Sequence, residues 1–555
     1  MAQALVSPTC PRVVDKVAAV TARLGAILKE LGYFAPPVAL VVILATKLVW
    51  DARIQSQRRK TLPPGPRPWP IIGNLSALVG DKPHRALQEL AFEFGGLMYL
   101  QLGSVPCVVL STAEAVREVF RSNDERILSR PKMLSFGIIS DNYRSISFGP
   151  PGKLWQSMRR FCSTELFTNT RVASYQGRRE EEVKHMLMVL VEESEKGKAV
   201  DLRSWLHDLS SNMTTRMLVN KRFFANRGEN DGKQEILKSE LEHVLEGFNV
   251  NIMRNVLSDY LPSLRYFAEE LHGARAALEA FRDEAATVGR KIVELEKHRQ
   301  RAQNPSKDEN YVPDFVDVLI GAPLDDGKSL SDTLLTVQVL EFFFAGTHTS
   351  SATVEWAMAE LITHPDLMKR AQAEVDGAVP ADRLVRDSDI PNLPYLQAVV
   401  KETFRMHPVL SLGGPRETTR PIEVNGYKIP AQTRLFVNIF AVHRDPAVYT
   451  DPETFDPDRF LTQHLHTNHC SGFDSHELIP FGVGRRMCPG FHLGNTLVHL
   501  MLANLLHRFH WSLPEGETIA TVQASVMSEK LYGLLFHPNE NLHLVPELKN
   551  GLPAS

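Results

Sequence analysis

The sequence predicts a mainly helical protein with a small β region, preceded by a helix that spans a membrane. Apolar residues recur at helical spacing over most of residues 83–377. Short runs rich in β-branched and aromatic residues occur early in the chain, at 98–110, and late, at 422–437. The continuous apolar segment Leu31–Trp50 has about the ~20 residues that cross the hydrocarbon core of a bilayer. Together these patterns indicate a helical domain behind a membrane anchor.

Composition excludes some classes of protein and selects none. The 555 residues are 43% hydrophobic and 23% charged, with a net charge of −3, which is ordinary for a globular chain. No stripe of Lys and Arg interleaved with aromatic residues follows the sequence, so we expect no nucleic-acid partner. The five cysteines form no CxxC pair, so they favour neither a disulfide framework nor a zinc site and suit a reducing compartment.

The N-terminal part divides into an extension and an anchor. Residues 1–30 carry apolar side chains among charges at roughly helical spacing, which is compatible with a helix on the membrane surface. Residues 31–50 form the expected transmembrane anchor, with Lys47 close enough to one end to snorkel. The alternative is a secretory signal peptide, but the apolar stretch begins late and no small-residue cleavage site follows it.

Residues 51–70 form a basic and proline-rich connector. Arg53, Arg58, Arg59 and Lys60 follow the anchor directly, which favours the cytosolic side for everything downstream. In Leu62–Pro70 each proline fixes φ and removes a donor, so no helix continues from the anchor into the domain. The connector is either a spacer or, as we expect, an element that orients the domain against the membrane.

Residues 71–555 are expected to form one catalytic domain, because no second linker, repeat or low-complexity tract interrupts them. Strand-like runs occur at 98–102, 106–110, 422–424, 427–429 and 434–437. The stretch 301–328, rich in Asn, Asp, Pro and Gly, is expected to be a loop inside this domain.

The most informative motif surrounds Cys488, in the sequence FGVGRRMCPG that begins at Phe481 and ends at Gly490. Glycines let a backbone turn sharply and approach a flat cofactor. Backbone N–H groups in such a loop, and a helix starting after Pro489, favour a thiolate over a thiol. A lone cysteine is more often an inert buried residue, yet the spacing of fixed residue types here favours a metal ligand.

A second motif interrupts the long apolar helix expected at 334–361. Its block AGTHTS, from Ala345 to Ser350, contains residues that are poorly suited to a helix interior. Ala345, Gly346 and Thr349 place a small-residue notch and a hydroxyl on one face. The notch suits either a ligand that approaches the backbone or close packing of a neighbouring helix.

Two further pairs lie at helical spacing. Glu402 and Arg405 are three residues apart, and Trp155 and Arg159 are four apart, so each pair shares a helix face. Taken alone, the first is most often a solvated surface ion pair, and the second is as often ordinary surface amphipathicity.

These motifs, in this order, resemble those of the cytochrome P-450 family, and PFGVGRRMCPG is similar to the version of plant microsomal members. The resemblance implies the family fold and a haem b whose iron is bound by the thiolate of Cys488. Phe481, Arg486 and Gly490 then belong to the haem-binding loop. Trp155, Arg159 and Arg486 are expected to hold haem propionates, and Arg416 sits where members carry another such arginine.

The resemblance also assigns the other motifs. Thr349 matches the threonine that manages protons and water beside the bound oxygen, while His348 stands where the family has an acid. Histidine relays protons near neutral pH, so both residues are candidate catalytic groups. Glu402, Arg405 and Arg459, the last in Pro457–Phe460, correspond to the structural triad behind the haem.

The resemblance further implies a monooxygenase at the endoplasmic reticulum membrane, single-pass and with a cytosolic domain. Electrons would come from NADPH through a separate membrane-bound reductase. The family's substrate segments are largely apolar here and suit a lipophilic small molecule, which similarity to flavonoid and phenylpropanoid hydroxylases makes phenolic or flavonoid. The alternatives are a diterpenoid oxidase, or a haem-thiolate isomerase or dehydratase that needs no oxygen.

Overall fold

A computed structural model of the chain describes residues 61–549, apart from 225–231, 253–256, 263–272, 304–310, 322–328, 465–475 and 533–534. The expected extension at 1–30, the anchor at 31–50 and the start of the connector lie outside the described residues. Within the described part, no helix has the length and apolar character of a membrane span. The described residues of Pro64–Asn425 and Ile429–Ser555 form one compact unit.

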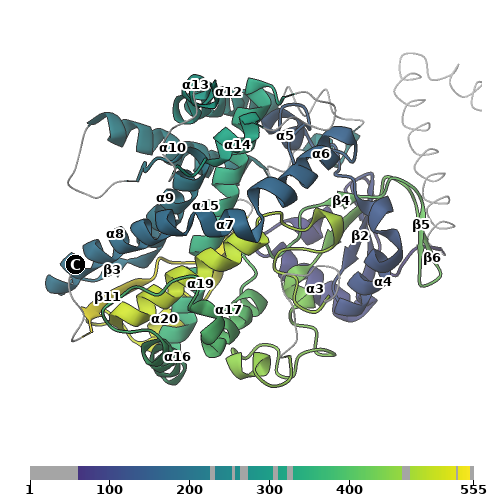
Figure 1. Cartoon of the computed structure of the whole chain (residues 1–555). Coiled ribbons are helices and arrows are strands. Elements are labelled where there is room, and N and C mark those ends of the chain that lie inside the picture. Colours follow the sequence, from purple (N-terminus) through teal and green to yellow (C-terminus); the bar gives the residue numbers. More distant parts are fainter. Residues whose placement is uncertain are drawn as a thin grey trace, which may run out of the picture. The chain divides into compact units, whose positions relative to one another are not determined.

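The compact unit is mainly helical, as predicted (Figure 1). Its helices are α3 Pro83–Phe94, α4 Ala113–Asn123, α5 Leu134–Ile139, α6 Lys153–Phe161, α7 Asn169–Ser174, α8 Gln176–Glu195, α9 Leu202–Val219, α10 Gly232–Ile252, α12 Ala274–Val293, α13 Leu295–Gln303, α14 Phe315–Gly321, α15 Asp332–Thr363, α16 Pro365–Ala378, α17 Pro394–Met406, α18 Ile439–Val442, α19 Phe491–Arg508 and α20 Ile519–Ser525.

The strands are short and lie in several small sheets. They are β1 Leu97–Leu102, β2 Val105–Leu110, β3 Val200–Asp201, β4 Arg416–Glu417, β5 Ile422–Val424, β6 Tyr427–Ile429, β7 Arg434–Val437, β8 Phe509–Ser512, β9 Glu529–Tyr532, β10 Leu535–Pro538 and β11 His543–Leu548. The strand-like runs read from the sequence are confirmed as β1, β2, β5, β6 and β7. The short β3 and β4 and the C-terminal strands β8 to β11 were not predicted.

The central element is α15, which is buried on nearly all sides. The Ser331 hydroxyl caps its first turn by accepting the Leu334 N–H at 3.3 Å, which satisfies a donor that has no partner within the helix. A helix that is apolar all round must be covered by other elements, and α9, α12, α17 and α19 pack against it. These neighbours hold α15 in place, and the candidate site lies against this helix.

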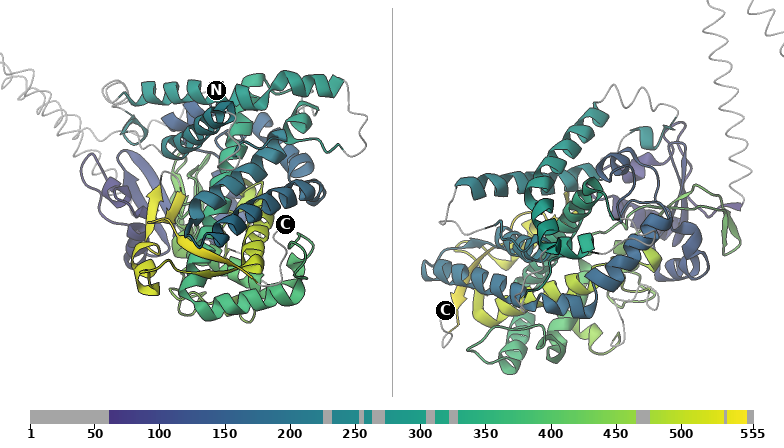
Figure 2. Two further views of the ribbon diagram at one scale, coloured as in Figure 1. Left: turned by 90° about the vertical axis from the view of Figure 1, so that its left-hand side faces the viewer. Right: turned by 45° about the horizontal axis from the view of Figure 1, so that its top comes forward.

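The largest sheet has the strand order β1-β2-β7-β4. β1 and β2 form an antiparallel hairpin, β7 joins β2 in parallel, and β4 returns antiparallel to β7. This sheet brings Arg416, the first residue of β4, to the edge of the helical part. Elsewhere the C-terminal segment, yellow in Figure 2, returns to the start of α9, where β11 pairs with β3.

The prediction of a loop over 301–328 is wrong in part, because α13 runs to Gln303 and α14 occupies Phe315–Gly321. A capping box starts α14. The Asp314 carboxylate accepts the Asp317 N–H at 3.0 Å, and the Asp317 carboxylate accepts the Asp314 N–H at 3.2 Å. Such reciprocal capping satisfies two helix N-terminal donors, and it outweighs the polar composition of the surrounding stretch.

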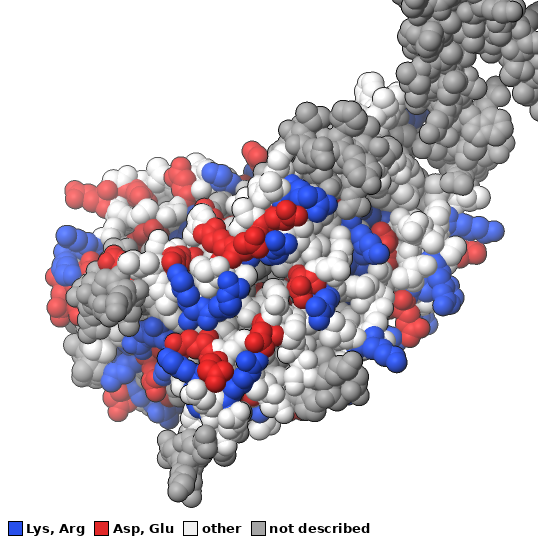
Figure 3. Space-filling view, turned by 90° about the horizontal axis from the view of Figure 1, so that it is seen from above, with Lys and Arg blue, Asp and Glu red and all other residues white. Residues whose placement is uncertain are grey.

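The face seen from above carries charges of both signs in close alternation (Figure 3). Surface ion pairs of the described residues include Lys291 with Glu240, at 2.6 Å. Such exposed pairs contribute little to stability, so the fold depends on its buried groups.

Candidate active site

The loop that carries Cys488 depends on two glycines in the left-handed region. Gly482 and Gly484 have φ of +80° and +65°, which other residues adopt only with strain. A Cβ on Gly484 would also lie 2.3 Å from the Asp124 Oδ1. The Cys488 N–H donates to the Phe481 carbonyl at 2.9 Å, and α19 begins at Phe491. The loop therefore turns back on itself and presents the sulfur just before a helix.

The Cys488 side chain is surrounded by protein but uncovered on one side. It is exposed, while its neighbour Met487 is buried. Burial raises the pKa of the Cys488 thiol, whereas the Gly490 N–H and the charge of Arg159 lower it. A group that is desolvated and yet accessible faces a space inside the molecule. The sulfur is thus placed to bind something that fills that space.

Four guanidinium groups gather beside this loop. They belong to Arg130, Arg159 on α6, Arg416 on β4 and Arg486 in the Cys488 loop. Burial lowers the pKa of each, and for Arg486 the charges of the other three lower it further. Among the residues that the structure describes, two carboxylates act on the group, Asp124 on Arg416 and Glu341 on Arg130. Burial raises the pKa of Glu341, so the cluster carries an excess of positive charge.

Three of these arginines are held by backbone carbonyls. Arg486 donates to the Leu128 carbonyl at 2.9 Å and to that of Ile146 at 3.3 Å. Arg130 donates to the Gly414 carbonyl at 2.6 Å, and Arg416 donates to that of Val483.

The guanidinium of Arg159, by contrast, has no hydrogen-bond acceptor among the residues that the structure describes. Its charge acts on Cys488. Arg159 is therefore the donor of this cluster left available for a ligand beside the sulfur.

Trp155 joins the cluster to the loop before α6. Its indole N–H donates to the Ile146 carbonyl at 3.0 Å, and the Arg486 guanidinium lies 4.1 Å from the centre of its ring. The Ile146 N–H in turn donates to the Gln338 side chain on α15 at 3.1 Å. Trp155 thus supports Arg486 by a cation–π contact, while its own donor is used by the protein.

The notch in α15 serves both purposes that the sequence left open. On one side, a Cβ on Gly346 would lie 3.0 Å from the Thr214 hydroxyl of α9, so the glycine permits close helix packing. On the other side, Ala345 is exposed in the middle of a buried helix. The Thr349 hydroxyl donates to the Ala345 carbonyl at 2.7 Å on that face. Ala345 and Thr349 therefore border an open space, and Gly346 does not.

His348 also faces α9, where it meets another histidine. Its ring centre lies 4.9 Å from that of His207 on α9 and 5.6 Å from that of Phe344. Burial lowers the pKa of His348 well below its ordinary value, and His207 and His537 lower it further. The imidazole is therefore neutral at physiological pH, with one nitrogen that donates and one that accepts.

Glu402, Arg405 and Arg459 are brought together and fully buried. Glu402 accepts two hydrogen bonds from Arg405, each at 2.7 Å, and one from Arg459 at 3.1 Å. Further guanidinium donors reach carbonyls at Thr450 and Pro452. Every charge in this group is paired and hydrogen-bonded, as burial requires.

Sequence reasoning missed His443, which joins this triad to the Cys488 loop. Its Nε2 accepts the Ile479 N–H at 2.8 Å, so its Nδ1 carries the proton and donates to the Phe404 carbonyl at 3.1 Å. Its own carbonyl accepts from Arg405. Arg130 was missed as well. Both are single residues outside any repeating pattern, and nothing beside them in the chain marks their role.

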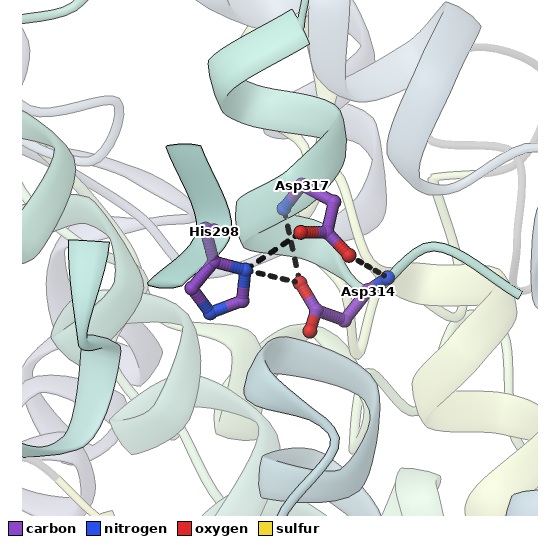
Figure 4. A group of neighbouring side chains, drawn as sticks. All are labelled: His298, Asp314 and Asp317. Carbon is purple, nitrogen blue, oxygen red and sulfur yellow. Dashed lines mark hydrogen bonds and ion pairs between the residues drawn. The ribbon is translucent and has the colours of Figure 1, made fainter. Parts of the chain in front are cut away.

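His298, Asp314 and Asp317 form a separate cluster with residue types that bind metals (Figure 4). The His298 Nδ1 lies 2.7 Å from Asp317 and 3.4 Å from Asp314. Arg301 approaches the same carboxylates at 3.3 and 3.5 Å. Both carboxylates also cap α14, and the Arg301 guanidinium already lies beside them. The cluster is therefore best explained as a structural contact that holds α13 against α14.

Comparison with known proteins decides the family. The sequence model described as Cytochrome P450 matches residues 63–543. The chain belongs to the cytochrome P450 family. It is therefore a haem-thiolate monooxygenase and uses haem b, and the excess positive charge beside an accessible thiol fits a porphyrin that carries two propionates. When bound, the haem supplies the activation of oxygen.

Plant P450 enzymes are among the most similar curated relatives. A flavonoid 3'-monooxygenase of Petunia hybrida is 36% identical over 87% of this chain and 92% of its own. A flavonoid 3',5'-hydroxylase of Crocosmia x crocosmiiflora is 37% identical over 86% and 90%. The ferruginol synthase of Salvia miltiorrhiza is 32% identical over 93% and 99%.

Solved structures agree on the fold. A zebrafish cytochrome P450 with progesterone superposes with a TM-score of 0.66 at 24% identity, covering 84% of this chain and 99% of that one. The P450 fold predicted from the sequence is thereby confirmed.

Proposed function

We propose that this P450 hydroxylates a flavonoid or a related phenolic compound, with O2 and electrons from an NADPH-dependent reductase. The observation that supports this most is the near full-length similarity to flavonoid hydroxylases. The lining expected for substrate is rich in aromatic side chains. Phe136 stacks on Phe148 with ring centres 4.3 Å apart, and Phe248 stacks on Phe344 at 5.9 Å. Such walls suit a flat aromatic substrate.

The deciding experiment is incubation of the haem-loaded protein and a plant reductase with flavonoids, phenylpropanoids and diterpenes, each with and without NADPH. We expect a hydroxylated flavonoid that forms only with NADPH. Oxidation of a diterpene instead would support the second candidate, which the similarity to ferruginol synthase favours. A product that forms without NADPH and O2 would point to an isomerase or dehydratase.

Cys488 is proposed as the iron ligand, with Arg159, Arg416 and Arg486 as partners of the propionates and Trp155 as their support. Phe481 and Gly490 shape the loop around the sulfur. The Cys488→Ser variant should lose the thiolate absorption of the reduced carbon monoxide complex. Retention of that spectrum would show that the ligand is another residue.

Thr349 and His348 are proposed to handle protons on the face that Ala345 exposes. Thr349→Ala should consume NADPH with less product, because its hydroxyl no longer orders protons and water there. His348→Asp restores the residue type usual in the family and should keep product formation. Unchanged product per NADPH in Thr349→Ala would remove this role.

We further propose that the protein is anchored by residues 31–50 in the endoplasmic reticulum membrane, with residues 71–555 in the cytosol. Exposed apolar side chains occur at the end of the connector and after it, within residues 69–92, including Trp69 at 68% and Phe92 at 74% exposure. A patch of this kind is typical of a membrane or protein contact. Deletion of residues 1–60 should weaken membrane binding. Phe92→Asp in the shortened protein should weaken the remaining membrane binding further.

The reductase is proposed to dock beside the Cys488 loop, where α6 exposes Lys153 and Arg160. Complementary charge mainly raises association rates. Lys153→Glu should therefore slow electron transfer at low salt, with an unchanged carbon monoxide spectrum.

A further inference from the structure

The helix α9 runs antiparallel to α15 and places one histidine opposite another. Contacts between the two helices occur in reverse order along the chain. Arg203 binds Glu355 at 3.0 Å, the rings of His207 and His348 lie 4.9 Å apart, and the Ser210 hydroxyl donates to the Thr347 carbonyl at 2.9 Å. His207 is thus fixed beside His348 by helix packing on both sides.

Burial decreases stepwise from His348 to the surface. The His348 Nε2 is enclosed and has no hydrogen-bond partner among the residues that the structure describes. The His207 side chain is 21% exposed, and Asp208 beside it is 31% exposed with its carboxylate 3.9 Å from the His207 Nδ1. Lys238 on α10 binds Asp208 at 3.3 Å. A buried imidazole with an unused nitrogen therefore adjoins one that water reaches.

The other groups around this pair do not provide an alternative outlet. His537 of β10 faces His348, and burial, with Arg203 and His207, lowers the pKa of His537 to about 3. Phe344 on α15 and Phe224 after α9 supply aromatic contacts only. Of the two histidines that face His348, His207 is the one that adjoins the partly exposed ion pair of Asp208 with Lys238.

We infer that His207 carries protons from solvent to His348. These protons then reach the face of α15 where Thr349 is proposed to handle oxygen. This inference rests on the proposed role of His348. Hydroxylation reduces the second atom of O2 to water, and so it consumes protons along with the electrons of NADPH. Protonated His207 gives a proton to the free nitrogen of His348, directly or through one water, and His348 releases the proton of its other nitrogen toward Thr349. Water then reprotonates His207, and neither residue changes its oxidation state.

The first test replaces His207 by an isosteric group that cannot titrate and by one that can. His207→Gln should lower product per NADPH about tenfold or more, a value below the usual contribution of a proton-transfer group. His207→Glu should restore much of the product. His243→Gln is the matched control, since His243 is 64% exposed on α10 and pairs with Glu284.

The second test does not depend on activity. Exchange of the imidazole C2 proton for deuterium, followed by mass spectrometry of the full-length protein, reports water access to each histidine. His207 should exchange severalfold faster than His348, and His348 should speed up in His207→Ala because its cover is removed. Equal exchange of the two rings, or an unchanged His348 rate, would overturn the route.

The outcomes separate this inference from the proposed function. If His207→Gln keeps wild-type product per NADPH while Thr349→Ala loses it, the relay through His207 is wrong and the proton-handling face stands. If no variant or wild-type protein forms an NADPH-dependent product, the proposed function itself fails. A carbon monoxide spectrum identical to that of wild type confirms that each variant is folded.

Discussion

Two clusters of buried charge are linked to the Cys488 loop, and they differ in how completely the protein satisfies them. In the triad of Glu402, Arg405 and Arg459, one carboxylate and several carbonyls accept the guanidinium donors. In the group of Arg130, Arg159, Arg416 and Arg486, cations crowd together and lower one another's pKa.

The difference shows which of the two clusters is complete once the chain has folded and which one needs a ligand. In the triad both guanidinium groups bind the ionised Glu402 directly and their other donors reach carbonyls, so the protein itself satisfies the triad. An excess of buried cations is unfavourable until an anion joins them. The arginine cluster is therefore adapted to a ligand that carries negative charge, and the accessible thiol of Cys488 lies beside it.

The largest effect is expected from Glu402→Gln, which leaves two buried guanidinium groups without a counter-charge. Breaking such a pair costs about 3–5 kcal/mol, and we expect this loss in the free energy of unfolding of the haem-free protein, measured with urea. Glu453→Gln is the control, because Glu453 is 64% exposed in its pair with Arg444. A loss for Glu402→Gln no greater than that of the control would contradict the structural role.

The next effect concerns pH and His443. Burial, with Arg405 and Arg444, lowers the pKa of His443 from 6.5 to about 3. Below pH 6.5 the unfolded chain takes up a proton that the folded chain refuses, so stability falls as pH drops from 6.5 toward 3. The loss reaches about 2 kcal/mol at pH 5. His443→Gln should show a shallower decline in urea titrations between pH 7 and 5, whereas an unchanged slope would exclude His443 as its source.

Removal of a cation from the arginine cluster should act in the opposite sense on the two forms of the protein. Arg486→Gln should release haem to an acceptor protein about tenfold faster, which corresponds to about 1.4 kcal/mol. The haem-free protein should be as stable as wild type or slightly more so, because repulsion is relieved. Arg486→Lys, which keeps the charge, should release haem at an intermediate rate. If Arg486→Gln destabilised the haem-free protein, the inference that the arginine cluster differs from the triad would be contradicted.

The smallest effect should come from the rim of the same cluster. Arg485 and Glu125 lie 2.6 Å apart but are 52% and 71% exposed. Exposed pairs of this kind contribute less than about 1 kcal/mol, so Glu125→Gln should leave both haem release and unfolding nearly unchanged. A larger change would mean that this surface pair belongs to the buried network.

Sequence reasoning located the parts of the site that local patterns encode. The Cys488 loop, the α15 notch and the Glu402 and Arg405 pair each combine several residue types at short spacing, so a local pattern marks each of them. His207, His443 and Arg130 act through contacts with distant segments, and a single residue carries no local signal of such a contact. α14 was missed because two aspartates looked like loop composition, although they form its cap.

The strands differed in the same way, because those with a local sequence pattern were predicted and the others were not. β1, β2 and β7 contain residues that favour sheets and were predicted, whereas β8, β9 and β11 mix His, Lys and Glu with apolar residues. Their pairing with one another, and with β3 and β10, decides their conformation. Such tertiary pairing overrides local preference.

The Ile146 peptide unit gives this enzyme a mechanical link between two sides of its pocket. Its N–H is held by Gln338 of α15, and its carbonyl receives both Trp155 and Arg486. A displacement of this peptide unit would therefore disturb α15, Trp155 and Arg486 together.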